Sequence, residues 1–322
     1  MTPQFGIIII GDEILSGKRA DKHLPKAIEL LAARGLQLAY ADYVGDDPER
    51  ITSTLARAFA ASRTSGDVVF STGGIGATPD DHTRQCAARA MGVALALHPE
   101  AKRLIEERIR DTAIEQDTAH EPDRHDNLHR LNMGVFPVGA QIIPNPYNKI
   151  PGFSCFVEPE YDGHPHAGPT PLGGGLGLAG ANGDAMEVLA GQQGLRNQHR
   201  RAAGAAAGGI HFVPGFPVMA WPMMEWILDQ HYPHLHQKLS FIEKSVIVMG
   251  SMEATLTPLM LAIEAEHASV KVFSLPSVDH PQYGRHIELG VKGPVEAVNR
   301  AYPALLAGLH QFNLQLGPEL VH

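Results

Sequence analysis

The fold is decided by the stretch Phe5-Gly6-Ile7-Ile8-Ile9-Ile10-Gly11-Asp12-Glu13, in which a short apolar run ends in an acidic loop. The same pairing recurs at Gly45-Asp46-Asp47, after residues 36–44, and at residues 72–81, after residues 67–71. Apolar runs without alternation are typical of strands that are buried on both faces. Because loops that leave the carboxyl ends of parallel strands meet at one sheet edge, we expect the three loops to lie together.

Each acidic loop is followed by residues with helical spacing. Asp21 is placed to cap a helix that continues to Arg34 and ends at Gly35, and Asp47 with Pro48 is placed to start the next helix. Asp80 or Asp81 is expected to begin the third helix. Three repeats of strand, loop and helix are the signature of an α/β fold with a mostly parallel sheet.

The later part of the chain predicts a hairpin, an insert and a second domain. Residues 153–157 and 210–213 have the pattern of two arms of one hairpin, and residues 158–209 between them are rich in Gly, Pro and Ala. Few large apolar residues occur there to offset the entropy of ordering, so we expect a mobile insert. Helices are also expected at 99–113 and 216–230.

A small α+β domain with a mixed or antiparallel sheet is expected toward the C-terminus. The predicted strands are 245–249, 270–275 and 287–291, and the predicted helices are 252–266 and 295–310. The first domain then comprises residues 1–157 and 210–240, and the second domain comprises residues 241–322.

Charge and composition narrow the class of protein. The net charge of −9 over 322 residues argues against a nucleic acid or an anionic membrane as partner, since either favours a basic surface. The chain contains only two cysteines, Cys86 and Cys155, which fits a reducing cytoplasm. The apolar run at 7–10 is too short for a signal or membrane segment. We expect a cytoplasmic protein.

The three loops suggest phosphate binding with a divalent cation. Gly73, Gly74 and Gly76 would let phosphate oxygens approach backbone N–H groups, and Thr72 and Thr78 would supply hydroxyl donors. Carboxylates beside a phosphate repel it unless a cation such as Mg²⁺ lies between them.

Several of these residues also have purely structural interpretations. The glycine-rich loop is open to being a tight connection whose Asp80 or Asp81 caps a helix, and Asp47 has the position of an N-cap. Asp46 has no such task, which favours it as a catalytic or metal-binding residue. Lys18 and Arg84 are candidates to neutralise phosphate, with a solvated role equally open for each.

Four spaced motifs resemble the molybdopterin-binding domain of the MoaB/Mog type, in the form found at the N-terminus of CinA, the competence/damage-inducible protein. They are residues 10–17, residues 44–47, residues 72–81, and Ile143-Pro144-Asn145-Pro146 leading to Pro151-Gly152-Phe153. Val213-Pro214-Gly215-Phe216-Pro217 is similar to a further turn of the family. The resemblance covers about residues 5–156 and 210–230, and residues 244–312 resemble the smaller domain that follows in CinA-like proteins.

The resemblance implies a three-layer α/β domain that binds a pterin or nucleotide as a small-molecule ligand, with Mg²⁺ as cofactor. The residues tied to adenylylation in the family fall on Asp46 and Asp81, which would also hold the Mg²⁺. Phosphate or ligand binding is expected from the remaining loop residues: Gly11, Asp12, Glu13, Thr72, Gly73, Gly74, Gly76, Thr78 and Asp80.

The resemblance leaves the reaction open. Adenylyl transfer in molybdenum cofactor metabolism is the leading hypothesis, hydrolysis of ADP-ribose or FAD by a CinA-like pyrophosphatase is the alternative, and a non-catalytic binding protein is a third possibility. The amidase activity of the CinA family is not expected, because no amidase domain follows the second unit. We also expect a homo-oligomer.

Overall fold

The computed structural model describes residues 3–119, 121, 124–157, 208–236 and 241–321. The chain forms two compact units, residues 1–235 and residues 236–322, and each is described by itself. The insert predicted at 158–209 lies outside the described residues except for Gly208 and Gly209, which belong to the hairpin.

The first unit is built on a six-stranded sheet with the strand order β2-β1-β3-β8-β7-β6. Strands β2, β1, β3 and β8 are parallel, whereas β7 runs antiparallel to β8, and β6 antiparallel to β7. The pairing of β7 with β8 confirms the predicted hairpin. The strands are β1 Phe5–Ile10, β2 Leu38–Val44, β3 Val68–Thr72, β6 Gln141–Ile143, β7 Gly152–Phe156 and β8 Gly209–Val213.

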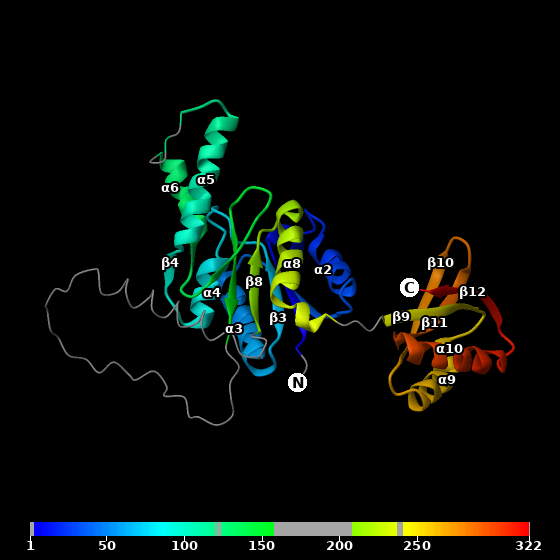
Figure 1. Ribbon diagram of the computed structural model, residues 1–322. Helices are drawn as coiled ribbons and strands as arrows, with labels where there is room; N and C mark the ends of the chain where they lie inside the picture. Colours follow the sequence, from blue (N-terminus) through cyan, green and yellow to red (C-terminus); the bar gives the residue numbers. More distant parts are fainter. Residues whose placement is uncertain (1–2, 120, 122–123, 158–207, 237–240, 322) are drawn as a thin grey trace, which may run out of the picture. The chain divides into compact units, whose positions relative to one another are not determined.

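Helices cover both faces of this sheet, which confirms the predicted three-layer α/β fold (Figure 1). Helices α2 and α8 pack on one face, and α3 and α4 pack on the other. Strands β4 and β5 pair as a separate two-stranded sheet, and helices α5 and α6 lie between them in the chain. The bounds are α1 Asp12–Leu15, α2 His23–Ala32, α3 Pro48–Ser65, α4 Thr83–Met91, β4 Leu95–Leu97, α5 Pro99–Glu115, α6 His125–Leu131, η1 Asn132–Gly134, β5 Val135–Pro137, α8 Pro217–His231 and η2 Pro233–Leu235.

Three phenylalanine rings form a continuous stack in the core. Phe153 of β7 lies between Phe136 and Phe212, with ring centroids 4.6 Å and 4.4 Å apart, respectively. All three side chains are buried. Offset stacking of this kind adds to the free energy gained from apolar burial. The stack therefore ties the small β4–β5 sheet to the hairpin of the main sheet.

Two of the three predicted capping residues accept hydrogen bonds from the first turn of their helix, and the third helix begins at a different residue from the one predicted. Asp21 accepts hydrogen bonds from the N–H groups of His23 and Leu24, and Asp47 accepts one from Arg50 N–H. The third helix, α4, begins at Thr83 after His82, so the prediction that Asp80 or Asp81 begins it is wrong. The carboxylate of Asp81 instead accepts hydrogen bonds within its own loop.

The two arms of the hairpin are joined by a backbone hydrogen bond at residues 157 and 208. Val157, just after β7, donates its N–H to the carbonyl oxygen of Gly208 at 3.0 Å. Gly208 and Gly209 also lie tight against backbone atoms, so that an added Cβ would come within 2.5 Å of Gly66 or Cys155. Residues 157 and 208 are therefore held next to each other at the end of the hydrogen-bonded pair of strands β7 and β8.

The second unit is a small α+β domain, as predicted. Its four-stranded antiparallel sheet has the order β10-β11-β9-β12, with α9 and α10 packed against it. The elements are β9 Phe241–Met249, α9 Glu253–Glu266, β10 Lys271–His280, β11 Gly284–Pro294, α10 Val295–His310 and β12 Gln315–Val321. Strand β12 was not predicted, because Gly317 and Pro318 interrupt its pattern.

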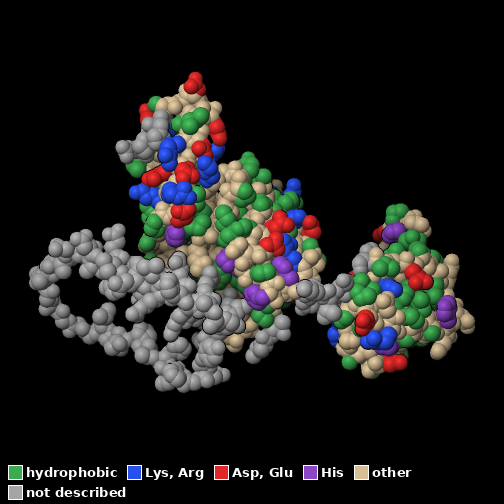
Figure 2. Space-filling model, viewed as in Figure 1, with side chains coloured by type: hydrophobic (Ala, Val, Ile, Leu, Met, Phe, Trp, Pro, Cys, Tyr) green, Lys and Arg blue, Asp and Glu red, His purple; other side chains and the backbone are tan. Residues whose placement is uncertain are grey.

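Charged side chains of both signs cover the α5 and α6 region (Figure 2). Several of them form i,i+3 or i,i+4 ion pairs along α5, including Arg103 with Glu100 and Glu107. Among the described residues, no helix is long and apolar enough to cross a membrane.

Candidate functional site

A cavity of about 400 Å³ lies where β1, β3 and β8 end. We call it the acidic cavity. Loops from all of the motifs noted in the sequence reach it, although they lie far apart along the chain. Its lining residues are Ile10, Gly11, Glu13, Arg19, Asp46, Gly73, Gly74, Ile75, Gly76, Ala77, Thr78, Asp80, Asp81, Met133, Asn148, Ile150, Pro151, Pro214, Gly215, Phe216 and Met219.

Free backbone donors line one wall of the acidic cavity. In the described part of the chain, the N–H groups of residues 74–77 make no hydrogen bond. The N–H of Gly73 donates to the carbonyl oxygen of Val213 at 3.1 Å, so this group is not available as predicted. Successive free N–H groups in a glycine-rich loop are the donors from which phosphate-binding loops are built.

Two glycines are required by the shape of this loop. Gly73 and Gly74 have φ angles of +95° and +67°, which other residues rarely adopt. A Cβ on Gly73 would lie 2.2 Å from the carbonyl oxygen of Ile10, and one on Gly74 would lie 2.1 Å from Thr83 Oγ1. The loop therefore approaches β1 and α4 at a distance that only glycine permits.

Asp46 and Asp12 join two of the acidic loops. The N–H of Asp12 donates to Asp46 Oδ2 at 2.9 Å, and the N–H of Asp46 donates to Asp12 Oδ1 at 3.2 Å. Asp46 thus has a structural task that the sequence did not indicate. Asp46 lines the cavity, whereas Asp12 is not among the lining residues and joins the two loops through its hydrogen bonds with Asp46.

The electrostatic setting of Asp46 disfavours its charged form. Burial raises the pKa of Asp46 above its usual range, and the charges of Asp12, Glu13 and Asp80 raise it further against an opposing hydrogen bond from the Asp12 N–H. A carboxylate with a raised pKa beside other carboxylates is stabilised by any cation that binds among them.

The Asp81 carboxylate accepts hydrogen bonds from its own loop. One oxygen, Oδ2, accepts from Thr78 N–H at 2.8 Å and from Thr78 Oγ1 at 2.5 Å, which occupies the hydroxyl that was predicted to bind phosphate. Arg84 is buried and donates to the carbonyl oxygens of Gly76 and Asn132. Arg84 therefore braces the loop and, like Lys18, does not line the acidic cavity.

Arg19 is a residue of the cavity that the sequence did not single out. The Arg19 guanidinium lies 6.0 Å from the ring centroid of Phe216 and 3.9 Å from Glu13 Oε1. Among the described residues that line the cavity, Arg19 is the one basic side chain. Nothing in the spacing of Arg19 indicates this role, because the contact depends on how α2 and α8 pack.

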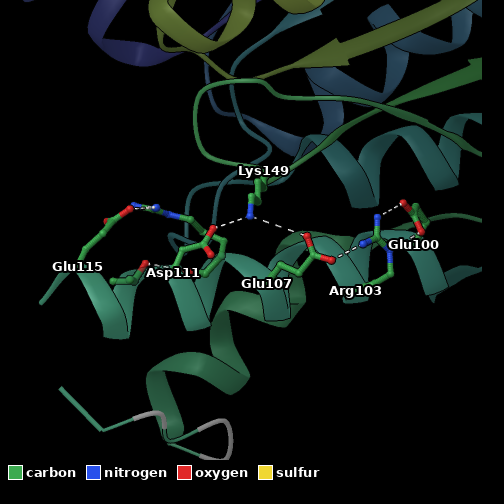
Figure 3. Close-up of polar contacts among 8 residues, drawn as sticks. Glu100, Arg103, Glu107, Asp111, Glu115 and Lys149 are labelled. Atoms are coloured by element: carbon green, nitrogen blue, oxygen red, sulfur yellow. Dashed lines mark hydrogen bonds and ion pairs between the residues drawn. The ribbon is translucent and has the colours of Figure 1, made fainter. Parts of the chain in front are cut away.

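The loop at 144–151 forms another wall of the cavity through Asn148, Ile150 and Pro151. Asn145 is buried and holds the loop by donating to Asn148 Oδ1 and to the carbonyl oxygen of Ile150. Lys149 points from the loop toward α5, where its Nζ lies 2.6 Å from Asp111 Oδ2 and 3.9 Å from Glu107 Oε2 (Figure 3). Asn145 and Lys149 thus fix this wall from two sides.

A second cavity, of about 270 Å³, adjoins the first on the side of α2 and α8. We call it the side cavity. It shares Ile10, Glu13, Arg19, Gly215 and Phe216 with the acidic cavity. Thr72, which was predicted to bind phosphate, lines the side cavity and not the acidic one.

The donor set of the acidic cavity fits Mg²⁺. Within the described ranges, no group of three or more His, Cys, Asp or Glu residues is arranged to hold a metal. Magnesium, however, usually binds through one or two carboxylates together with water and substrate phosphates. Asp46 and Asp81 can supply these carboxylates, and the excess of acidic over basic lining residues would otherwise repel a phosphate.

The raised pKa of Asp46 predicts a pH dependence of stability. The folded protein keeps the Asp46 proton to a higher pH than the unfolded chain, so this stabilisation is complete in acid and is lost as pH rises through the folded-state pKa. Asp46→Asn has no such charge, and we expect it to melt above the wild-type protein at neutral pH. Scanning calorimetry should show that this difference shrinks as the pH falls and disappears below the ordinary pKa of an aspartate. A difference that is constant with pH would contradict the prediction.

Comparison with known proteins gives a family and several relatives. The family model described as "Probable molybdopterin binding domain" matches residues 6–237. A CinA-like protein of Gloeobacter violaceus is 35% identical over 152 residues, which are 47% of this chain and 32% of the relative. A CinA-like protein of Anaeromyxobacter sp. is 30% identical over 154 residues, which are 48% of this chain and 34% of the relative. The match spans about a third of these curated relatives.

Among solved structures, CinA from Thermoplasma acidophilum, a protein of unknown function, aligns with a TM-score of 0.45 and 19% sequence identity. The alignment covers 70% of this chain and 97% of that chain. MoaB from Thermus thermophilus, described as a molybdopterin biosynthesis enzyme, aligns over 73% of this chain and 94% of its own with a TM-score of 0.34 and 16% identity.

Proposed function

The chain belongs to the family of the probable molybdopterin binding domain, and on that premise we propose that its acidic cavity binds a phosphorylated pterin or nucleotide together with Mg²⁺. The observation that carries the proposal is the meeting of free N–H groups, at residues 74–77, with the carboxylates of Asp46 and Asp81 in one cavity. Phosphate oxygens suit the first set of groups and a divalent cation suits the second.

Each group has a role in attack on a phosphoanhydride. The N–H groups of residues 74–77 would hold a phosphate that does not react and so orient the one that does. Arg19 would neutralise charge on the ligand at the open side of the cavity. Asp46 and Asp81 would hold the Mg²⁺, which when bound offsets the charge that develops on the transferring group.

We propose adenylyl transfer in molybdenum cofactor metabolism as the reaction. A phosphate oxygen of molybdopterin would form a bond to the α-phosphorus of ATP, the bond from that phosphorus to the bridging oxygen would break, and pyrophosphate would leave. If water is the nucleophile, the same cavity would cleave ADP-ribose to AMP and ribose phosphate. A protein that binds these ligands without turnover is the remaining outcome.

Incubation of the full chain with Mg²⁺ separates these reactions. We expect adenylylated pterin and pyrophosphate from ATP plus molybdopterin, and loss of the product when Mg²⁺ is chelated. AMP from ADP-ribose or FAD would identify a pyrophosphatase instead. Measurable binding with no product from either incubation would show that the chain is a binding protein.

We further propose a cytoplasmic homo-oligomer that acts on a small molecule rather than on nucleic acid or a membrane. The mixture of Lys and Arg with Asp and Glu over α5 and α6 supports a solvated surface there rather than a basic docking face (Figure 2). Both cysteines are unpaired and buried, which is compatible with a reducing compartment. Light scattering of the purified chain would measure the oligomeric state.

A further inference from the structure

The side cavity contains buried polar groups that the fold itself does not use. Thr72 is 1% exposed and His23 is 5% exposed, and both line this cavity. Thr72 Oγ1 and His23 Nδ1 are buried, and neither has a hydrogen-bond partner among the described residues. Because a buried polar group without a partner costs folding free energy, two of them in one cavity point to a ligand.

The direction of Thr72 follows from the alternation of side chains along β3. Val68 and Phe70 face the core beneath α2 and α8, whereas Val69 faces the opposite core. Thr72 is two residues beyond Phe70, so its side chain lies on the α2 and α8 face of the sheet. Ile9 of the neighbouring strand β1 is on the same face and lines the same cavity.

The chemistry of His23 is set by its second nitrogen. His23 Nε2 lies 3.0 Å from the carbonyl oxygen of Gly215, which can only accept a hydrogen bond. In the neutral ring the proton is therefore on Nε2, and Nδ1 has a free lone pair. A ligand that satisfies His23 must bring an N–H or O–H donor, whereas the Thr72 hydroxyl can donate or accept.

Arg19 and Phe216 stand between the two cavities. Both residues line both cavities, and the Phe216 side chain is 56% exposed, with the guanidinium of Arg19 over its ring. A planar heterocycle can stack on such a ring, while the guanidinium contacts the phosphate attached to it. Arg19 and Phe216 together therefore suit a ligand that has a heterocycle at one end and a phosphate at the other.

We propose that the side cavity receives the heterocycle of the phosphorylated ligand, an adenine or a pterin, while its phosphates occupy the acidic cavity. The inference rests on the proposed function, because it takes the phosphate site as given. Both rings carry an exocyclic amine beside a ring nitrogen, which matches an acceptor at His23 Nδ1 and a hydroxyl at Thr72. The 270 Å³ cavity falls below the roughly 300–1,000 Å³ of sites for drug-sized ligands, as expected for a cavity that holds only part of a ligand.

The chain offers a variant for each of these polar groups. Thr72→Val deletes a hydroxyl that has no partner among the described residues. His23→Gln keeps an N–H donor for Gly215 and replaces the ring-fixed Nδ1 acceptor with a flexible amide oxygen that is not held at the same place. Ser71→Ala is the matched control. Ser71 is the neighbour of Thr72 in β3, and its hydroxyl is also buried and unpartnered among the described residues, but it lines neither cavity.

Calorimetric titration of each variant with ADP-ribose, molybdopterin and inorganic pyrophosphate, all with Mg²⁺, tests the assignment. We expect Thr72→Val and His23→Gln to weaken binding of ADP-ribose or molybdopterin about five- to tenfold, without change for pyrophosphate. Ser71→Ala should bind all three as the wild-type protein does. The probe that the wild-type chain binds more tightly distinguishes adenine from pterin.

Other outcomes overturn the inference, and they differ from a failure of the proposed function. Unchanged affinity of Thr72→Val and His23→Gln for a heterocyclic probe that the wild type binds would show that the ring lies elsewhere. Equal weakening of pyrophosphate would show that the variants act through the phosphate site or the fold. If the wild-type chain binds none of the probes, the proposed function fails, and the inference that rests on it fails too.

Discussion

Asp46→Asn is expected to lower turnover at saturating Mg²⁺ by about a hundredfold, in whichever of the two assays shows turnover. The amide oxygen of asparagine can still accept the hydrogen bond that Asp12 N–H makes with Asp46 Oδ2, so the two loops should remain joined. What is lost is a negative charge in the acidic cavity that would hold Mg²⁺. Steady-state kinetics over a range of Mg²⁺ concentrations measure the effect.

Asp12→Asn is the matched control for this prediction. It removes one charge from the other side of the same pair and also keeps an acceptor for the backbone of Asp46, but Asp12 does not line the cavity. We expect it to retain at least a third of the wild-type rate. If Asp46→Asn is as active as Asp12→Asn, then Asp46 does not hold the metal and the site assignment is wrong.

Phe153→Ala is expected to lower the free energy of unfolding of the first unit by about 4 kcal/mol. The Phe153 side chain is fully buried between the rings of Phe136 and Phe212, so its removal leaves a cavity and breaks two stacked contacts. Such a loss is a large share of the stability of a typical domain. The first unit should therefore unfold at a much lower urea concentration.

Tryptophan fluorescence makes this measurement selective. The only two tryptophans, Trp221 and Trp226, are both in α8, so their emission during urea unfolding reports the first unit. The control is Tyr147→Ala, where an aromatic side chain that is 62% exposed should cost less than about 0.5 kcal/mol. Equal unfolding midpoints for the two variants would mean that the phenylalanine stack does not stabilise the unit.

Most of the fold was predictable because its signals are local. The buried strand at 5–10, the Asp47-Pro48 helix start and the glycine at 35 each express a preference of a few neighbouring residues, and the structure follows all three. Strand β12 was missed because Gly317 and Pro318 weaken the local signal. That strand pairs with β9, about seventy residues away, and its pairing is a property of the whole unit.

The candidate site was predictable in its loops but not in the assignment of its groups. The rule that parallel strands end at one edge placed the three acidic loops together. This rule did not show that Gly73 N–H donates a hydrogen bond to the carbonyl oxygen of Val213 or that the Thr78 hydroxyl donates one to Asp81. Nor did it show that Arg84 is buried. Each of these depends on contacts between elements, which local spacing does not encode.

The closed hairpin has a consequence for how this protein can change over time. Strand β8 is parallel to β3, and the cavities lie where these strands end, whereas residues 157 and 208 lie where β8 begins. A strand of five residues spans roughly 15 Å, which separates that point from the chemistry. A change of sequence between 157 and 208 therefore enters the sheet at the end of β8 that lies opposite the cavities. For a protein engineer, the same point is a place to graft a reporter domain whose termini are adjacent.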